Sequence, residues 1–103
     1  MTSEQVMIRW KISPDAVERH QELLQTVYEE LKSVRPEVPR YDTYQLEDKV
    51  TFVSFVELTN GPGILGGLQA FQRYRGELDA MCDEPPSVTP LQCVGEYAAQ
   101  FAP

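Results

Sequence analysis

Two neighbouring residues near the N-terminus, Arg9 and Trp10, have side chains that could bind or activate a small molecule. They stand at adjacent positions of an alternating segment, so they point to opposite faces of a strand. A guanidinium stays charged and can pair with an anionic oxygen, while an indole offers a flat surface to an aromatic ring. The alternatives are a salt bridge from Arg9 to Glu57 or Glu96 and packing of Trp10 in the core.

Glu57 and His20 are the two candidates for proton transfer. Glu57 interrupts an apolar segment, where burial would suit its carboxyl to act as a general base. The alternative for Glu57 is an ion pair at the end of the strand. His20 is the only histidine, and its ring suits proton transfer near neutral pH. It falls on the apolar stripe of a helix, so a packing residue with one hydrogen bond is the alternative reading.

Three tyrosines on expected strands, Tyr41, Tyr44 and Tyr97, combine a ring with a hydroxyl donor. Such residues are common in ligand pockets and equally common at dimer interfaces. Motifs for metals and phosphates are missing, since the sequence contains no HxH, HExxH or DxDxD pattern and neither GxGxxG nor GxxxxGK[ST]. We therefore expect no metal and no cofactor.

The composition predicts one folded domain over residues 1–103. The chain is 42% hydrophobic, with 16 acidic and 9 basic residues and a net charge of -7, which disfavours nucleic acid as a partner. Its apolar runs are too short to cross a membrane and its N-terminus lacks the features of a signal peptide, so we expect a cytoplasmic protein. Cys82 and Cys93 match neither a redox nor a zinc spacing and are expected to be reduced, with a disulfide left open.

The periodicity of apolar residues predicts four strands and two helices. Ser13 and Pro14 mark the start of the first helix, whose apolar stripe is Val17, His20, Leu24, Val27, Leu31 and Val34. The second helix carries Leu68, Phe71, Leu78 and Cys82, with Tyr74 and Met81 flanking the same face, and is expected to end before Pro85-Pro86. The expected strands are Val6 to Ile12, Arg40 to Glu47, Val50 to Leu58 and Val88 to Ala98, the middle two forming a hairpin.

This order of elements is that of an α+β, ferredoxin-like β-α-β-β-α-β sandwich with a four-stranded antiparallel sheet. Helices then cover only one face of the sheet. The strand Val50 to Leu58 is apolar on both faces, with Val53 and Phe55 opposite Phe52, Val56 and Leu58. Because large apolar patches are rare on monomers, we expect a second copy to cover the free face, giving a homodimer.

Several short segments carry a resemblance to a known family: Ile12-Ser13-Pro14-Asp15, Arg40-Tyr41-Asp42-Thr43-Tyr44, Ser54-Phe55-Val56-Glu57-Leu58, Phe71-Gln72-Arg73-Tyr74 and Val94-Gly95-Glu96-Tyr97. Together they resemble the antibiotic-biosynthesis monooxygenase-like group of dimeric α/β barrels. The resemblance implies two sheets that pair as a dimeric α/β barrel, with a pocket between each sheet and its helices or toward the barrel interior. It spans nearly the whole chain in layout but carries no catalytic signature.

Members of this group include cofactor-independent oxygenases that act on aromatic phenols or quinols. On this resemblance Arg9 and Glu57 are the catalytic candidates, and the substrate-binding candidates are Trp10, Tyr41, Tyr44 and Tyr97. The sequence departs from the better-defined enzymes, because their pocket tryptophan falls on Leu58 or Thr59, the only asparagine is Asn60 in a loop, and the second helix has no histidine. The sequence therefore disfavours haem degradation as the function.

Two main functions follow as hypotheses. The first is a cofactor-independent monooxygenase that acts on a small aromatic phenol or quinol-like compound. The alternative is a non-catalytic dimer that binds a small aromatic ligand, or a structural dimer whose lumen is filled by side chains such as Phe52, Phe55 and Trp10. The sequence does not say which face of the first strand lines a pocket.

Overall fold

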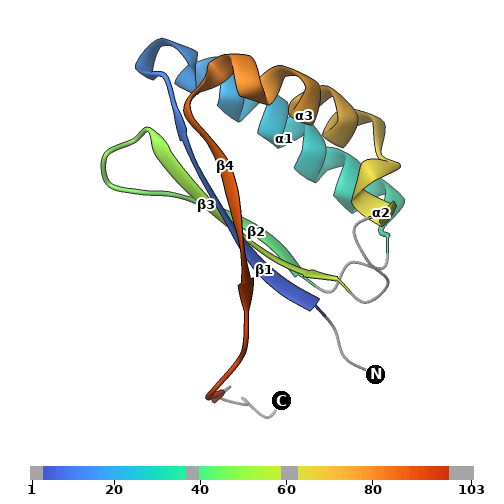
Figure 1. Cartoon of the computed structure of the whole chain (residues 1–103). Coiled ribbons are helices and arrows are strands. Elements are labelled where there is room, and N and C mark those ends of the chain that lie inside the picture. The colour runs from blue at the N-terminus through green and yellow to red at the C-terminus, as the bar shows by residue number, and fades with distance from the viewer. Residues whose placement is uncertain (1–3, 37–39, 59–62, 98–103) are drawn as a thin grey trace, which may run out of the picture.

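The structure, a computed structural model, describes residues 4–36, 40–58 and 63–97. Four strands form one antiparallel sheet in the order β2-β3-β1-β4, and the helices lie on one face of it (Figure 1). The predicted α+β sandwich is confirmed. In chain order its elements are β1 (Glu4–Ile12), the 3-10 helix η1 (Pro14–Ala16), α1 (Val17–Val34), β2 (Arg40–Gln45), β3 (Thr51–Leu58), α2 (Gly63–Gly66), α3 (Gln69–Met81) and β4 (Cys82–Leu91).

The alternation predicted for β1 is present, and its helix-facing residues Trp10 and Ile12 are buried. In α1 the buried residues are His20, Leu23 and Val27, spaced by three and four, so Leu23 takes a core position that the sequence reading did not assign. Val34 was expected on the stripe but is exposed, because it stands in the last turn, where the helix ends. Within the described segments no helix is long and apolar enough to cross a membrane.

The predicted hairpin of β2 and β3 is confirmed, and Asp48 builds its turn. The Asp48 carboxylate accepts hydrogen bonds from the backbone N–H groups of Val50 and Thr51, at 3.0 and 2.8 Å. Lys49 then adopts a left-handed backbone conformation with φ of 71°, which costs a residue with a Cβ atom free energy.

Replacing Lys49 with glycine should therefore stabilise the fold. Glycine adopts this conformation without the Cβ penalty, and we expect a gain of about 0.5–1 kcal/mol in the free energy of unfolding. Urea denaturation of the variant beside Lys49→Ala measures it. Alanine keeps the Cβ atom, so equal stability of the two variants would contradict the backbone explanation.

The last strand differs from the expectation. β4 begins at Cys82 directly after α3 and runs through Pro85 and Pro86, which were expected to close the second helix ahead of a strand starting at Val88. Both prolines lie on an edge strand, at a register shift where Arg9 pairs with Ser87 but Lys11 pairs with Glu84. A missing backbone N–H is tolerated at such a bulge. Of the expected strand Val88 to Ala98, residues 92–97 are not strand and Ala98 lies outside the described residues.

The two cysteines stand at opposite ends of β4. Cys82 opens the strand and Cys93 follows its end, and both are free thiols. At 3.3 Å per residue an extended segment of this length separates them by about 35 Å. A disulfide needs Cα atoms within about 7 Å, so the intrachain bond left open from the sequence is incompatible with this fold.

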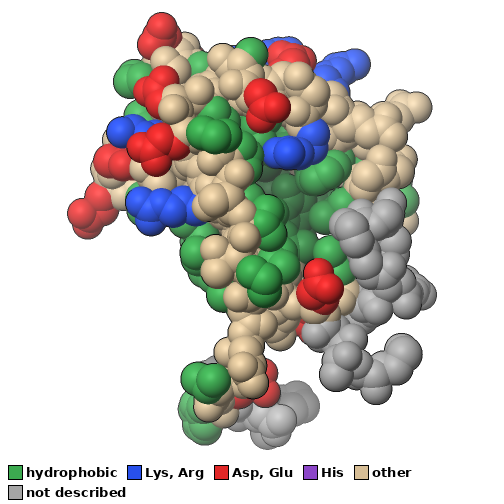
Figure 2. All heavy atoms as spheres, in the orientation of Figure 1, with side chains coloured by type: hydrophobic (Ala, Val, Ile, Leu, Met, Phe, Trp, Pro, Cys, Tyr) green, Lys and Arg blue, Asp and Glu red, His purple; other side chains and the backbone are tan. Residues whose placement is uncertain are grey.

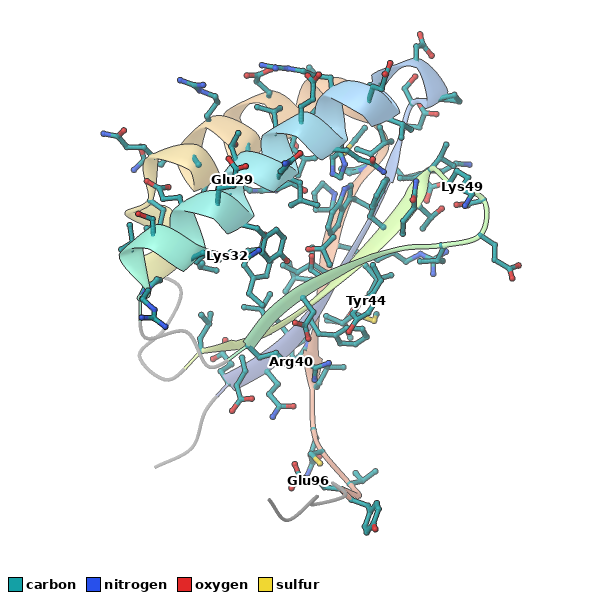
Figure 3. The ribbon with its side chains drawn as sticks, turned by 180° about the vertical axis from the view of Figure 1, so that it is seen from behind. Glu29, Lys32, Arg40, Tyr44, Lys49 and Glu96 are labelled. Atoms are coloured by element: carbon teal, nitrogen blue, oxygen red, sulfur yellow. The ribbon has the colours of Figure 1, made fainter. Side chains whose placement is uncertain are left out.

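The core lies between the sheet and the helices, and no helix of the described residues lies on the other face of the sheet (Figure 1). Strand pairing places Met7 of β1, Val53 and Phe55 of β3 and Tyr44 of β2 on that helix-free face. Figure 3 shows Tyr44 and Arg40 on the side of β2 turned away from the helices. The apolar character of β3 on both faces, predicted from its sequence, is present in the structure.

Candidate functional site

A cavity of about 440 Å³ lies between the helix-facing side of the sheet and the helices α2 and α3. Figure 2 shows hydrophobic side chains gathered around this hollow. A mostly apolar cavity of this size, with few polar groups, suits a small aromatic molecule. Its lining side chains are Glu4, Val6, Ile8 and Trp10 from β1, Tyr41 from β2, Ser54, Val56 and Leu58 from β3, Leu65 from α2, Phe71, Tyr74, Arg75 and Leu78 from α3, and Pro86 and Val88 from β4.

Regular spacing brings these side chains to one place. Alternate residues of β1 face the helices, and α3 turns Phe71, Tyr74 and Leu78 toward the sheet at spacings of three and four. Glu30 of α1 fixes the start of α3, because its carboxylate accepts a hydrogen bond of 2.9 Å from the Ala70 backbone N–H. This contact satisfies one of the N–H groups that every helix leaves without a partner in its first turn.

Replacing Glu30 with alanine should lower the free energy of unfolding by about 1 kcal/mol, the usual cost of losing a helix cap. Thermal unfolding measures the change. Glu29→Ala is the matched control, because the exposed Glu29 side chain, labelled in Figure 3, accepts a hydrogen bond from Gln25 within α1. Equal losses in the two variants would show that α1 propensity, and not the contact with α3, sets the effect.

Trp10, His20 and Tyr74 form a hydrogen-bonded group at the wall of the cavity, here called the Trp10–His20–Tyr74 network. The indole Nε1 of Trp10 donates to Nε2 of His20 at 3.1 Å, and the Tyr74 hydroxyl lies 3.0 Å from the same nitrogen. His20 is fully buried, and its Nδ1 has no hydrogen-bond partner in the described part of the chain. Because an indole can only donate, Nε2 of His20 carries the lone pair and Nδ1 carries the proton.

Burial decides the charge state of this network. It lowers the pKa of His20 to about 4, and it raises the pKa of the Tyr74 hydroxyl well above its ordinary value. Burial raises the pKa of Tyr41 in the same direction. At neutral pH the imidazole and both phenols are therefore uncharged, and the network is a set of neutral donors and acceptors.

The structure divides the six predicted site residues among three places. Trp10 and Tyr41 line the cavity. Arg9, Glu57 and Tyr44 lie on the helix-free face of the sheet, since β1 and β3 pair Arg9 with Val53 and β2 and β3 pair Tyr44 with Val53.

Tyr97 belongs to neither face. It follows β4 in a segment that extends away from the body of the protein, and its side chain is 91% exposed. Arg9 and Glu57, the two catalytic candidates, are four positions apart along paired strands, or about 13 Å. The structure therefore does not bring Arg9 and Glu57 to the cavity or into contact with each other.

Four polar residues of the cavity were not assigned to a site from the sequence: Glu4, Ser54, Tyr74 and Arg75. Tyr74 was recognised only as flanking the apolar face of a helix. Ser54 is a polar residue in an apolar strand, almost fully buried and within 2.7 Å of the Thr43 hydroxyl. That isolated polar position in β3 was the available signal. Of the family positions noted above, Leu58 lines the cavity, whereas Thr59 and Asn60 lie outside the described residues.

Comparison with solved structures agrees with this architecture, although no family model and no curated protein matches the chain. Rv0793 from Mycobacterium tuberculosis has a TM-score of 0.71 at 24% identity, over 94% of this chain and 100% of its own. A protein named antibiotic biosynthesis monooxygenase has a TM-score of 0.73 at 19% identity, over 89% and 99%. A provisionally named antibiotic biosynthesis monooxygenase from Bacteroides thetaiotaomicron has a TM-score of 0.75 at 13% identity, over 97% of both chains. The chain thus has the fold shared by proteins named antibiotic biosynthesis monooxygenases, as its sequence resemblance predicted.

Proposed function

We propose that the protein is a cofactor-independent monooxygenase that holds a small aromatic phenol or quinol-like compound in the cavity between sheet and helices. The observation that carries this proposal is the cavity itself, about 440 Å³. It is lined mostly by aromatic and aliphatic side chains, with Glu4 and Arg75 as its charged residues, and is bordered by the neutral Trp10–His20–Tyr74 network. The fold shared with structures named antibiotic biosynthesis monooxygenase supports the reaction class.

The proposed reaction needs only molecular oxygen as oxidant. For an anthrone-like substrate, a ring CH₂ becomes C=O, one oxygen atom enters the product, and the other leaves as water with the two hydrogens. The substrate must first lose a proton to give an electron-rich anion. Trp10 and Tyr41 are the predicted binding residues that this site uses. Arg9 and Glu57 reach a substrate only if the site lies between the sheets of two copies.

Oxygen consumption tests the proposal. Purified protein is mixed with anthrone or a hydroquinone while an oxygen electrode and chromatography follow both reactants, with heat-denatured protein as control. We expect uptake of one oxygen molecule per ketone formed. Binding without oxygen uptake would contradict catalysis and favour the non-catalytic binding protein.

The charge state of the side chains at the cavity favours the second function, a non-catalytic binding protein. The imidazole of His20, with a pKa of about 4, is a weak base, and the phenols of Tyr41 and Tyr74 stay protonated at neutral pH. A network of this kind orients a ligand more readily than it removes a proton.

The proposal includes a homodimer in the cytoplasm. The helix-free face carries Met7, Val53 and Phe55, and apolar patches of this kind mark interfaces. The segment after β4 also presents apolar side chains to solvent, with Val94 93% exposed. A second copy that packs sheet against sheet would cover the face.

A further inference from the structure

Tyr74 connects the buried His20 with the cavity wall. Its hydroxyl oxygen lies 3.0 Å from Nε2 of His20, and the residue lines the cavity. The same Nε2 accepts the Trp10 indole N–H at 3.1 Å. Two donors therefore share one in-plane lone pair, which can make only one full-strength hydrogen bond.

The Trp10 N–H and the Tyr74 hydroxyl differ in how easily each can turn away from Nε2 of His20. The Trp10 N–H is fixed in a rigid, 3% exposed indole and has no other acceptor among the contacts of the described residues. The Tyr74 hydroxyl rotates about its C–O bond without moving the ring. Because Trp10 alone can satisfy Nε2, the Tyr74 proton can turn away from His20 at little cost whenever the cavity offers another acceptor.

We propose that the Tyr74 hydroxyl is the contact for a ligand oxygen and that it serves hydroxyl and carbonyl ligands alike. A hydroxyl ligand donates to the Tyr74 oxygen while Tyr74 still donates to His20. A carbonyl ligand instead receives the Tyr74 proton, while Trp10 continues to donate to His20. This inference rests on the proposed ligand site in the cavity and names the residue that recognises the ligand.

This adaptability fits a reaction in which a substrate donor becomes a product acceptor. The phenolic tautomer of an anthrone-like substrate presents O–H at the oxygen that is C=O in the quinone product. A side chain that could only donate would leave the O–H hydrogen of the substrate unpaired, and one that could only accept would leave the carbonyl of the product unpaired. Either loss costs binding free energy in an apolar cavity. His20 acts as a positioning residue, because it contacts the Tyr74 hydroxyl and holds it at the cavity wall.

Three tricyclic probes of nearly equal shape test the proposal: fluorene, 9-fluorenol and 9-fluorenone. Calorimetric titration of the full-length protein should show both oxygen-bearing probes binding about 5- to 10-fold more tightly than fluorene, the value of one net hydrogen bond. In Tyr74→Phe all three affinities should become equal. Tyr28→Phe is the matched control, because the Tyr28 hydroxyl bonds to Thr43 and the Tyr41 carbonyl instead.

His20 is tested by the advantage of the two oxygen-bearing probes over fluorene. In His20→Phe no acceptor holds the Tyr74 hydroxyl at the cavity wall, so both probes should lose several-fold of that advantage while the affinity for fluorene is kept. His20→Gln, which keeps an acceptor, should restore the advantage. A variant that merely loosened the fold would weaken all three probes together.

The outcomes separate this inference from the proposed function. Equal binding of the three probes to the unaltered protein, or preserved discrimination in Tyr74→Phe, would overturn the role of Tyr74 while leaving the cavity as a binding site. Failure of every probe to bind at millimolar concentration would overturn both. Discrimination that disappears only in Tyr74→Phe supports the assignment.

Discussion

Lowering the pH from 6.5 to 4 should cost the protein about 3 kcal/mol of unfolding free energy through His20 alone. Burial holds the pKa of His20 at about 4, whereas an unfolded histidine titrates near 6.5. Between these values the unfolded chain binds a proton that the folded chain does not, so stability falls as the pH falls through this window. Above about pH 7.5 both states hold a neutral ring, and His20 contributes no pH dependence.

Urea unfolding between pH 4 and 7, compared with His20→Gln, isolates this effect. The side chains that face His20 are Trp10, Phe52 and Tyr74, and none of them changes charge in this range. Asp48, whose pKa is lowered by its hydrogen bonds to Thr51, titrates in both proteins and cancels in the comparison. Parallel pH profiles for the two proteins would show that His20 does not titrate in a buried site.

The fluorescence of Trp10 provides a second measurement of the protonation of His20. Trp10 is the only tryptophan, and its indole N–H donates to Nε2 of His20. An imidazolium quenches a neighbouring indole and cannot accept its N–H. We therefore expect the fluorescence of the folded protein to fall near pH 4 before unfolding. The fluorescence of His20→Gln should stay level over the same range.

The fold could be predicted from the sequence because local patterns and tertiary structure agree along most of the chain. Alternation in β1, the Ser13-Pro14 helix start and the polar turn at Asp48 each mark their elements. The start of the last strand was predicted too far along the chain. Pro85 and Pro86 have no backbone N–H to donate within a sheet, so from the sequence they indicated the end of the preceding helix and not a strand. Only the sheet order shows that β4 is an edge strand, where those N–H groups are dispensable.

The candidate site was less predictable for two physical reasons. Alternation shows that Arg9 and Trp10 point to opposite faces, but the choice of face depends on where the helices pack. The pairing of His20 with Tyr74 joins residues 54 positions apart, and each alone reads as part of an apolar helix face. The contact of Tyr74 with Nε2 of His20 is evident only from the structure, which places α1 and α3 side by side over β1.

Replacing Phe55 with glutamate should convert the proposed dimer to a monomer. Phe55 lies at the centre of the helix-free face, between Tyr44, whose ring centroid is 6.0 Å away, and Arg40, whose guanidinium is 5.4 Å from the ring centroid. In a two-fold packing of sheets the change would bury two carboxylates, which costs several kcal/mol. We expect the dimer to weaken by at least about 100-fold.

Native mass spectrometry and light scattering at micromolar concentration measure the oligomeric state. Gln25→Glu on the exposed side of α1 adds the same charge away from the sheet and should leave the dimer intact. A monomeric unaltered protein, or a Phe55→Glu protein that stays dimeric, would contradict sheet-to-sheet packing.

The same variant also locates the ligand site. Phe55 points away from the cavity, so a monomeric Phe55→Glu protein should still bind the tricyclic probes through Trp10 and Tyr74. If binding disappears together with the dimer, the ligand lies between the two sheets, where Arg9 and Glu57 stand. Arg9→Ala and Glu57→Gln then become the decisive variants, whereas retained binding excludes both residues from ligand contact.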